Sequence, residues 1–174
     1  MQPVLVKESG GKRVKIFFDQ ESRNREDFGE TLGTILYTGT GRYVLGDRRA
    51  TPEAMKQIEK CKEFIYLPVY AYVHGGVALS TQPFSCPWDS GQSGIIYASR
   101  EKVRTALGVK RLGKKLLQKA FDALSEEVRE YSKILNGEVY GYILEDESGK
   151  EIDSCWGFID EPEKIADEAL IGNI

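Results

Sequence analysis

Short segments in which apolar and polar residues alternate, or in which apolar residues run on for the length of a strand, are spread along most of this chain. Such segments are typical of β-strands that bury one or both faces. They cover residues 4–8, 12–19, 32–38, 64–73, 77–81, 94–98, 138–145 and 151–158. Glycine-containing turns at Gly10-Gly11, Gly75-Gly76 and Gly149 connect three consecutive pairs of these segments. Because such turns favour hairpins, the pattern predicts an antiparallel sheet built from hairpins.

A longer segment, residues 113–135, follows a helical period instead. Its apolar residues recur at spacings of three and four and predict one buried stripe on an amphipathic helix. The stripe consists of Leu117, Ala120, Leu124, Val128, Tyr131 and Leu135. Gly113 is expected to cap the start of this helix, and Asn136-Gly137 to end it. We expect the helix to pack its stripe on one face of the sheet.

Three shorter helices are predicted from their capping residues. Thr51 and Pro52 suit the N-cap and the first position of a helix that runs to about residue 62. Ser99 is expected to cap a second helix, which Gly108 ends, and Pro162 opens a third. Strands joined mainly by hairpins, together with these helices, define an α+β fold. At 174 residues we expect a single domain over residues 1–174.

The composition is that of a globular protein, with 41 % hydrophobic and 29 % charged residues. No apolar run approaches the roughly 18 residues of a membrane span, and residues 1–8 lack the apolar core of a signal peptide. We therefore expect a protein of the cytoplasm with no membrane partner. Three widely spaced cysteines and a single histidine, His74, predict neither a disulfide framework nor a zinc site, and no cofactor is expected.

The charge is strongly polarised along the chain. Residues 100–119 carry eight basic side chains against Glu101 alone, a balance of +7, whereas residues 137–174 carry eleven acids against two lysines, a balance of −9. Lysines and arginines at spacings of four repel one another on a helix, and a positive charge at a helix start opposes the helix dipole. These unfavourable positive charges are compensated in one of two ways. Either solvent or the acidic segment 137–174 offsets them within the protein, or a phosphate or an acidic protein binds them from outside. The predicted partner-binding residues are Lys110, Arg111, Lys114 and Lys115, with Trp88 if that side chain is exposed.

A helix-turn-helix is a specific form of the nucleic-acid hypothesis. Residues 99–117 resemble this motif superficially, because Ala106-Leu107-Gly108-Val109 is typical of its turn. The motif places a small residue four before the glycine and an apolar residue six after it. Arg104 and Lys114 stand at these two positions, so the match fails at both.

The segment 83–92 is the densest in chemically distinctive residues. A thiol enzyme is one interpretation, with Cys86 activated by His74 and with Asp89 or Gln92 orienting the base or supplying an oxyanion donor. The alternative is a rigid loop in which Cys86 and Trp88 plug the end of the core and Asp89 bonds backbone amides. This second interpretation is preferred, because cysteine is often buried and turn residues explain the rest. No catalytic set is predicted beyond the candidates Cys86, His74 and Asp89.

A second distinctive segment, Asp153-Ser154-Cys155-Trp156-Gly157-Phe158, lies on the last predicted strand. On a regular strand, Trp156 and Phe158 point to the same face, and two such side chains are more often core than a ligand platform. Gly157 between them is compatible with a β-bulge.

These strings resemble an uncharacterised protein family that is common in bacteriophages and other mobile elements. The resemblance rests on Cys86-Pro87-Trp88-Asp89-Ser90-Gly91-Gln92, on the segment 153–158, and on shorter strings before and between them, in order over roughly residues 40–158. The family has no established activity, so the resemblance implies a genomic context and no mechanism. Small accessory proteins of mobile elements often inhibit host defences by binding.

The leading hypothesis is therefore a non-catalytic binding protein of a phage or mobile element. It would inhibit a host defence of the restriction or CRISPR type by protein–protein contact, with a host or phage protein as its partner. The first alternative is a cysteine-dependent enzyme that uses Cys86 and His74. The second alternative is a nucleic-acid-binding protein that uses the basic segment 100–119.

Overall fold

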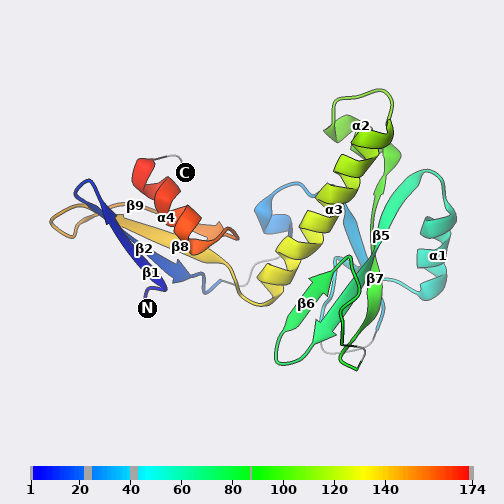
Figure 1. Ribbon diagram of the computed structural model, residues 1–174, viewed down its shortest axis with the longest axis horizontal. Helices are drawn as coiled ribbons and strands as arrows, with labels where there is room; N and C mark the ends of the chain where they lie inside the picture. Colours follow the sequence, from blue (N-terminus) through cyan, green and yellow to red (C-terminus); the bar gives the residue numbers. More distant parts are fainter. Residues whose placement is uncertain (1, 22–24, 40–42, 87, 173–174) are drawn as a thin grey trace. The chain divides into compact units, whose positions relative to one another are not determined.

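The protein has an α+β fold whose two sheets lie in two compact units (Figure 1). The computed structural model describes residues 2–21, 25–39, 43–86 and 88–172. Unit 1 consists of Met1–Phe28 and Lys133–Ile174, and unit 2 consists of Gly29–Ser132. A sequence of hairpins predicts one sheet, whereas the chain forms a separate sheet in each unit. That the chain is a single domain stays a prediction.

Unit 1 is a four-stranded antiparallel sheet with one helix on a face (Figure 1). Its strands are β1 (Leu5–Ser9), β2 (Lys12–Phe18), β8 (Tyr140–Glu145) and β9 (Glu151–Phe158), in the order β1-β2-β8-β9. Helix α4 (Pro162–Ile171) packs against β1, β2 and β8. A short 3-10 helix (Arg25–Phe28) follows β2 along the chain. The core between sheet and helix consists of Val14, Ile16, Tyr142, Leu144, Ile165, Ala166 and Ala169.

A β-bulge at Gly157 overturns the prediction that Trp156 and Phe158 share a face. Tyr140 pairs with Phe158 and Gly141 pairs with Trp156, so Gly157 is an extra residue in β9, at φ +91°. The extra residue reverses the alternation of side chains. Phe158 therefore packs on the face of Tyr142 and α4, with ring centroids of Phe158 and Tyr142 5.8 Å apart. Trp156 lies on the other face, over Gly141, and remains 37 % exposed.

Unit 2 is a mixed five-stranded sheet in the order β4-β3-β7-β5-β6. Its strands are β3 (Thr34–Tyr37), β4 (Arg48–Arg49), β5 (Phe64–Val73), β6 (Val77–Ser80) and β7 (Ser90–Ser99). The short strand β4, which the sequence pattern does not predict, pairs in parallel with β3, and all other pairs are antiparallel. Strand β7 begins at Ser90, four residues before the predicted start at Gly94, because a bulge opposite Val69 and Tyr70 lets it continue past Ser93.

The three helices of unit 2 begin at the predicted capping residues. Helix α1 (Pro52–Lys60) begins after Thr51, whose side chain accepts a hydrogen bond from the Ala54 amide at 3.3 Å. Helix α2 (Arg100–Ala106) begins after Ser99 in the same way, and Gly108 follows it at φ +64°. Helix α3 (Lys114–Leu135) begins after Gly113, whose carbonyl accepts from Leu116 and Leu117.

Helices α1 and α3 lie on opposite sides of the sheet of unit 2 (Figure 1). On one face Met55 of α1 packs with Leu36 and Ile95. The opposite face packs against α3, whose buried residues Ala120, Leu124, Val128 and Tyr131 confirm the predicted stripe. Gly33 allows this close packing, because a Cβ there would lie 2.6 Å from side-chain atoms of Ile96 and Leu124.

Candidate functional surfaces

The four predicted basic residues gather at the corner between α2 and α3, and we call this group the basic corner: Lys110, Arg111, Lys114 and Lys115. All four side chains are exposed. Within unit 2, and among the residues that the structure describes, none of them makes an ion pair. Lys114 and Lys115 occupy the first turn of a 22-residue helix that has no acidic residue there. Their charges therefore add to the positive end of the α3 dipole.

The corner is not a helix-turn-helix. That motif joins its helices by a turn of three or four residues. Here α2 ends at Ala106 and α3 begins at Lys114, so the connection, residues 107–113, has seven residues. The connection leaves α2 through a glycine turn, in which the Gly108 amide donates to Thr105 and the Val109 amide donates to Arg104. The basic side chains thus lie on the α2–α3 connection and the first turn of α3, and α3 is not the recognition helix of a helix-turn-helix motif.

The loop between β6 and β7 brings Asp89 close to both Cys86 and His74. The Asp89 carboxylate lies 3.9 Å from the Cys86 sulfur and 3.5 Å from His74 Nδ1. Within the part of the chain that the structure describes, no hydrogen bond joins the Cys86 thiol to His74. A thiol–imidazole pair needs the base next to the sulfur, with the carboxylate behind the base. Here the Asp89 carboxylate contacts both the Cys86 sulfur and the His74 imidazole. This arrangement does not support the cysteine-enzyme hypothesis, which stays a prediction.

Two further hydrogen bonds involve the described residues of this loop. The Val73 amide donates to the Asp89 carbonyl at 3.0 Å, and the Ser90 hydroxyl donates to the Cys86 carbonyl. The first joins Asp89 to the end of β5, and the second joins Cys86 to the first residue of β7. Among the described residues the Asp89 carboxylate contacts Cys86 and His74 and no backbone amide, so the prediction that it bonds backbone amides is wrong. That the segment is a rigid loop stays a prediction, and Pro87 lies outside the described residues.

Trp88, at the tip of this loop, is 92 % exposed. The prediction that it plugs the end of the core is therefore wrong. The physical reason is that β7 begins at Ser90 and the loop turns outward before it, while the core of unit 2 is already closed by aliphatic side chains such as Val69, Leu79 and Ile96. Trp88 meets the condition under which the sequence assigns it to a partner-binding surface.

Sequence reasoning missed a row of tyrosines that leads to this loop. Alternate residues of β5 point to the face on which α1 lies, because Tyr66 pairs with Tyr97 and Pro68 pairs with Ile95 on that face. The row consists of Tyr66, Pro68, Tyr70 and Tyr72, and we call it the tyrosine row. The sequence does show aromatic residues at every second or fourth position of this segment. Aromatic residues are common in strands of any kind, so this spacing does not by itself indicate a binding surface.

The tyrosine row is partly open to solvent and carries no charge. Tyr66 is 37 % exposed, and Tyr70 and Tyr72 are half-buried. Their cross-strand neighbours are uncharged: Ser80, Ala78, Gln92 and Ser90. Among the described residues none of the three hydroxyl groups makes a hydrogen bond. Phe84 and His74 lie beside Tyr72, with ring centroids 5.8 and 6.2 Å from that of Tyr72.

The corner between α2 and α3 and the loop that precedes β7 lie beyond opposite ends of the sheet of unit 2 (Figure 1). Strand β7 runs between them, from Ser90 next to the Trp88 loop to Ser99 at the start of α2. Ten residues of extended chain span about 30 Å. The sequence groups these residues as one partner-binding set, whereas the structure separates them into two surfaces.

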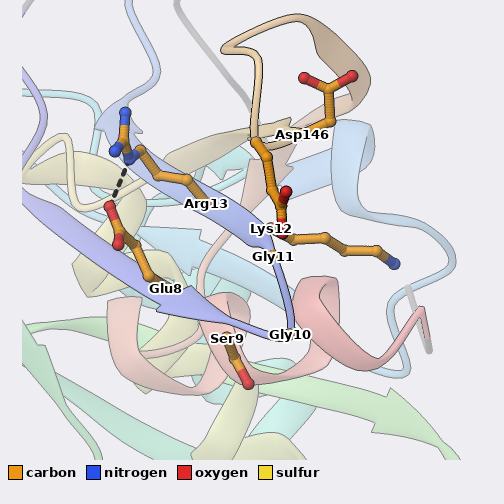
Figure 2. Close-up of a pocket in the computed structure, with 8 residues that line it drawn as sticks. Glu8, Ser9, Gly10, Gly11, Lys12, Arg13 and Asp146 are labelled. Atoms are coloured by element: carbon orange, nitrogen blue, oxygen red, sulfur yellow. Dashed lines mark hydrogen bonds and ion pairs between the residues drawn. The ribbon is translucent and has the colours of Figure 1, made fainter.

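A hollow in unit 1 lies between the β1–β2 and β8–β9 turns (Figure 2). The Asp146 carboxylate accepts hydrogen bonds from the Ser148 hydroxyl and from the backbone amides of Ser148 and Lys150. These bonds, the Ser148 hydroxyl first, lower the pKa of Asp146. Glu147 lies so close to Gly11 that a Cβ on Gly11 would be 2.4 Å from its carboxylate. The hollow lies between two adjacent turns, and the hydrogen bonds of the Asp146 carboxylate stabilise the β8–β9 turn.

Among the described residues, no group of three or more His, Cys, Asp and Glu side chains is arranged to hold a metal ion. No helix of the described chain is long and apolar enough to cross a membrane. Comparison with known proteins finds no matching family model, no matching curated protein and no matching solved structure.

Proposed function

We propose that this protein is a non-catalytic binding protein of a phage or other mobile element. In this proposal it acts in the host cytoplasm and inhibits a host defence system of the restriction or CRISPR type by contact with a protein. The observation that carries the proposal is Trp88, 92 % exposed at the end of an uncharged row of tyrosines. The resemblance of the segments 86–92 and 153–158 to a phage-borne family supplies the biological setting.

The composition of this surface is the one that protein-binding surfaces use. Tyrosine and tryptophan provide large, rigid contact areas at a low cost in conformational entropy, and serine and glycine provide adaptable hydrogen bonds. Tyr66, Tyr70 and Tyr72 offer free hydroxyl groups beside apolar rings, and Ser80 and Ser90 lie next to them. A partner that covers these rings gains apolar burial and can satisfy the hydroxyls.

Contacts of the residues on either side of Trp88 also favour its presentation to a partner. The ends of the Trp88 loop are held by the Val73–Asp89 and Ser90–Cys86 hydrogen bonds and by the contact between His74 and Asp89. Binding then costs little ordering of the loop. Tryptophan is among the residue types enriched at the energetic centres of protein interfaces.

The test is capture of partners from host lysate with the tagged protein, with and without nuclease, followed by titration against the captured protein. We expect a stoichiometric protein that survives nuclease, and we expect Trp88→Ala to weaken its binding by about 30-fold or more, which corresponds to about 2 kcal/mol. Tyr43→Ala is the matched control, since Tyr43 is an exposed aromatic residue (43 %) of the same unit outside the row. Equal binding by both variants and the parent protein would overturn the assignment.

The cysteine-enzyme alternative has its own test. Thiolate-dependent alkylation of Cys86 would be measured by mass spectrometry in the parent protein and in His74→Gln. A Cys86 that reacts no faster than Cys155, which is exposed and lies in unit 1, would remove this alternative.

A further inference from the structure

We propose that the basic corner is a second binding surface, separate from the Trp88 surface, and that it binds the phosphate backbone of double-stranded nucleic acid without reading its sequence. This proposal does not depend on the proposed function, because a different set of side chains at the other end of the sheet of unit 2 carries it. It follows from three properties of the corner: unpaired charge, residue type and shape.

The charge at the corner has no partner within its unit. Lys110, Arg111, Lys114 and Lys115 are exposed and make no ion pair among the described residues of unit 2. Lys119 is exposed one turn further along α3, and Glu101 is the single acid between residues 100 and 119. Unit 2 as a whole carries fifteen basic and eleven acidic residues, a net charge of +4. Such a group of positive charges lowers the energy of a polyanion placed against it.

The residue types at the corner distinguish nucleic acid from an acidic protein. Protein interfaces have an apolar or aromatic centre and are depleted in lysine. Interfaces with nucleic acid are polar and rich in lysine and arginine. Three of the four corner residues are lysines, and Leu107, 37 % exposed, is the one exposed large hydrophobic side chain in the described segment 100–119. The corner thus fits phosphates, whereas the tyrosine row fits a protein.

The shape of the corner indicates contact with the backbone and not with the bases. Base reading in the major groove requires an inserted helix or a two-stranded ribbon. Here α2 and α3 are joined by a seven-residue connection, and the basic side chains sit on that connection and on the first turn of α3. A shallow hollow beside them is lined by Arg104, Thr105, Gly108, Val109, Lys110 and Glu101. Contacts of this kind position a duplex without specifying its sequence.

The experiment measures binding of a fluorescein-labelled 20-base-pair DNA duplex by fluorescence anisotropy at several salt concentrations. If each of the four corner residues neutralises one phosphate, log K falls with log salt at a slope of about −3.6, so that raising salt from about 50 to about 200 mM weakens binding by roughly 100-fold. Two duplexes of unrelated sequence are expected to bind with the same affinity. No detectable binding at about 50 mM salt would overturn the proposal.

The decisive variant replaces the four corner residues by glutamine (K110Q, R111Q, K114Q and K115Q). Its matched control removes the same net charge at four exposed lysines elsewhere (K12Q, K56Q, K60Q and K150Q). We expect the corner variant to bind at least about 10-fold more weakly, with a salt slope less steep by about 2 to 4, and the control to bind nearly as the parent does. Equal losses in the two variants would mean that only net charge matters and would overturn the site.

Two further arms separate the partner classes. Poly-L-glutamate that competes with the duplex at equal charge concentration would show a general polyanion site, as for an acidic protein, and would overturn nucleic acid as the partner. Trp88→Ala is expected to keep duplex affinity within about twofold, because Trp88 lies about 30 Å from the corner along β7. Loss of duplex binding in Trp88→Ala would contradict the separation of the two surfaces.

Discussion

The two compact units differ in how their charges are used. Unit 1 carries nine basic and sixteen acidic residues, a net charge of −7, whereas unit 2 carries a net charge of +4. Several of the few cations in unit 1 are paired within that unit, as Lys7 with Asp167, Lys15 with Glu145 and Lys133 with Glu161. In unit 2 the basic corner has no such pairs among the described residues.

The comparison teaches that paired and unpaired charges have different consequences for this fold. Surface ion pairs contribute little stability, so the pairs of unit 1 serve mainly to balance its charge. The unpaired lysines at the start of α3 oppose the helix dipole and cost stability. A cost of this kind, confined to one exposed corner, is the pattern expected where a surface serves binding.

The largest expected loss of stability comes from a substitution at Gly94 in unit 2. A Cβ at this position would lie 1.9 Å from the Leu36 carbonyl oxygen, which is backbone and cannot turn away. We expect Gly94→Ala to lower the free energy of unfolding by about 3 kcal/mol or more. Hydrogen exchange measured by mass spectrometry should show the loss of protection first in peptides of β3, β5 and β7.

Gly91→Ala is the matched control on the same strand, since a Cβ there meets no atom within 4 Å. Its effect should stay within about 0.5 kcal/mol. If Gly94→Ala removed protection equally from β1, β2 and β8, the two units would unfold together, and their separation in the structure would have no energetic counterpart.

The next largest loss of stability is expected when the packing of α4 on the sheet of unit 1 is weakened. Ile165 is 1 % exposed and is the large aliphatic side chain that α4 contributes to the core of the sheet. We expect Ile165→Ala to cost about 2 to 4 kcal/mol, measured by urea unfolding. Ile171→Ala on the same helix should be nearly neutral, because Ile171 is 68 % exposed. Similar losses for both would contradict the assigned face of α4.

A pH-dependent effect in unit 1 arises from Tyr142, whose hydroxyl donates to the Asp153 carboxylate at 2.5 Å. Burial, and then this hydrogen bond and the charge of Asp153, raise the pKa of Tyr142. Because the pKa is raised on folding, the stabilisation is complete below the unfolded value of about 10 and is lost as pH rises through the folded value. Tyr142→Phe should cost about 1 kcal/mol at pH 7.

The same variant sharpens the comparison at high pH. Between about pH 9 and 11 the parent protein should lose stability in unit 1 as the unfolded tyrosine ionises, and Tyr142→Phe should lose less. Urea midpoints at the two pH values measure this difference. An identical alkaline loss in the parent and the variant would assign the titration to other groups.

The smallest effect concerns the start of α3. Lys114→Glu places a negative charge at the positive end of a 22-residue helix and should stabilise unit 2 by about 0.3 to 1 kcal/mol. Lys12→Glu, at an exposed strand position, is the control for a simple change of net charge. Thermal unfolding measures both. A lower melting temperature for Lys114→Glu would mean that Lys114 has a stabilising contact that the structure does not show.

Much of the local structure follows from short stretches of sequence. The turns at Gly10-Gly11 and Gly75-Gly76, the caps at Thr51 and Ser99, and the buried stripe of α3 were all predicted. Each depends on residues within a few positions, through backbone freedom at glycine, a side-chain oxygen at an N-cap or the helical period. The α+β class follows from the same local signals.

The candidate surfaces were predicted in part. The exposed lysines and arginine of the basic corner follow from composition, and Trp88 was a candidate on condition of exposure. Their separation was not predictable, because it depends on the direction of β7. The tyrosine row was missed, because alternate aromatic residues on a strand are compatible with either a buried or an open face until the neighbouring strands and helices are placed.

The sequence by itself determined where most of the strands, turns and helices of this protein form, and where its charge gathers. Only the tertiary structure decided that β2 pairs with β8 and β3 with β7, so that one run of hairpins becomes two sheets. It also decided that Gly157 turns Phe158 away from Trp156, that Asp89 stands between Cys86 and His74, and that Trp88 faces solvent. These outcomes depend on pairings between residues far apart in the chain, which no local pattern encodes.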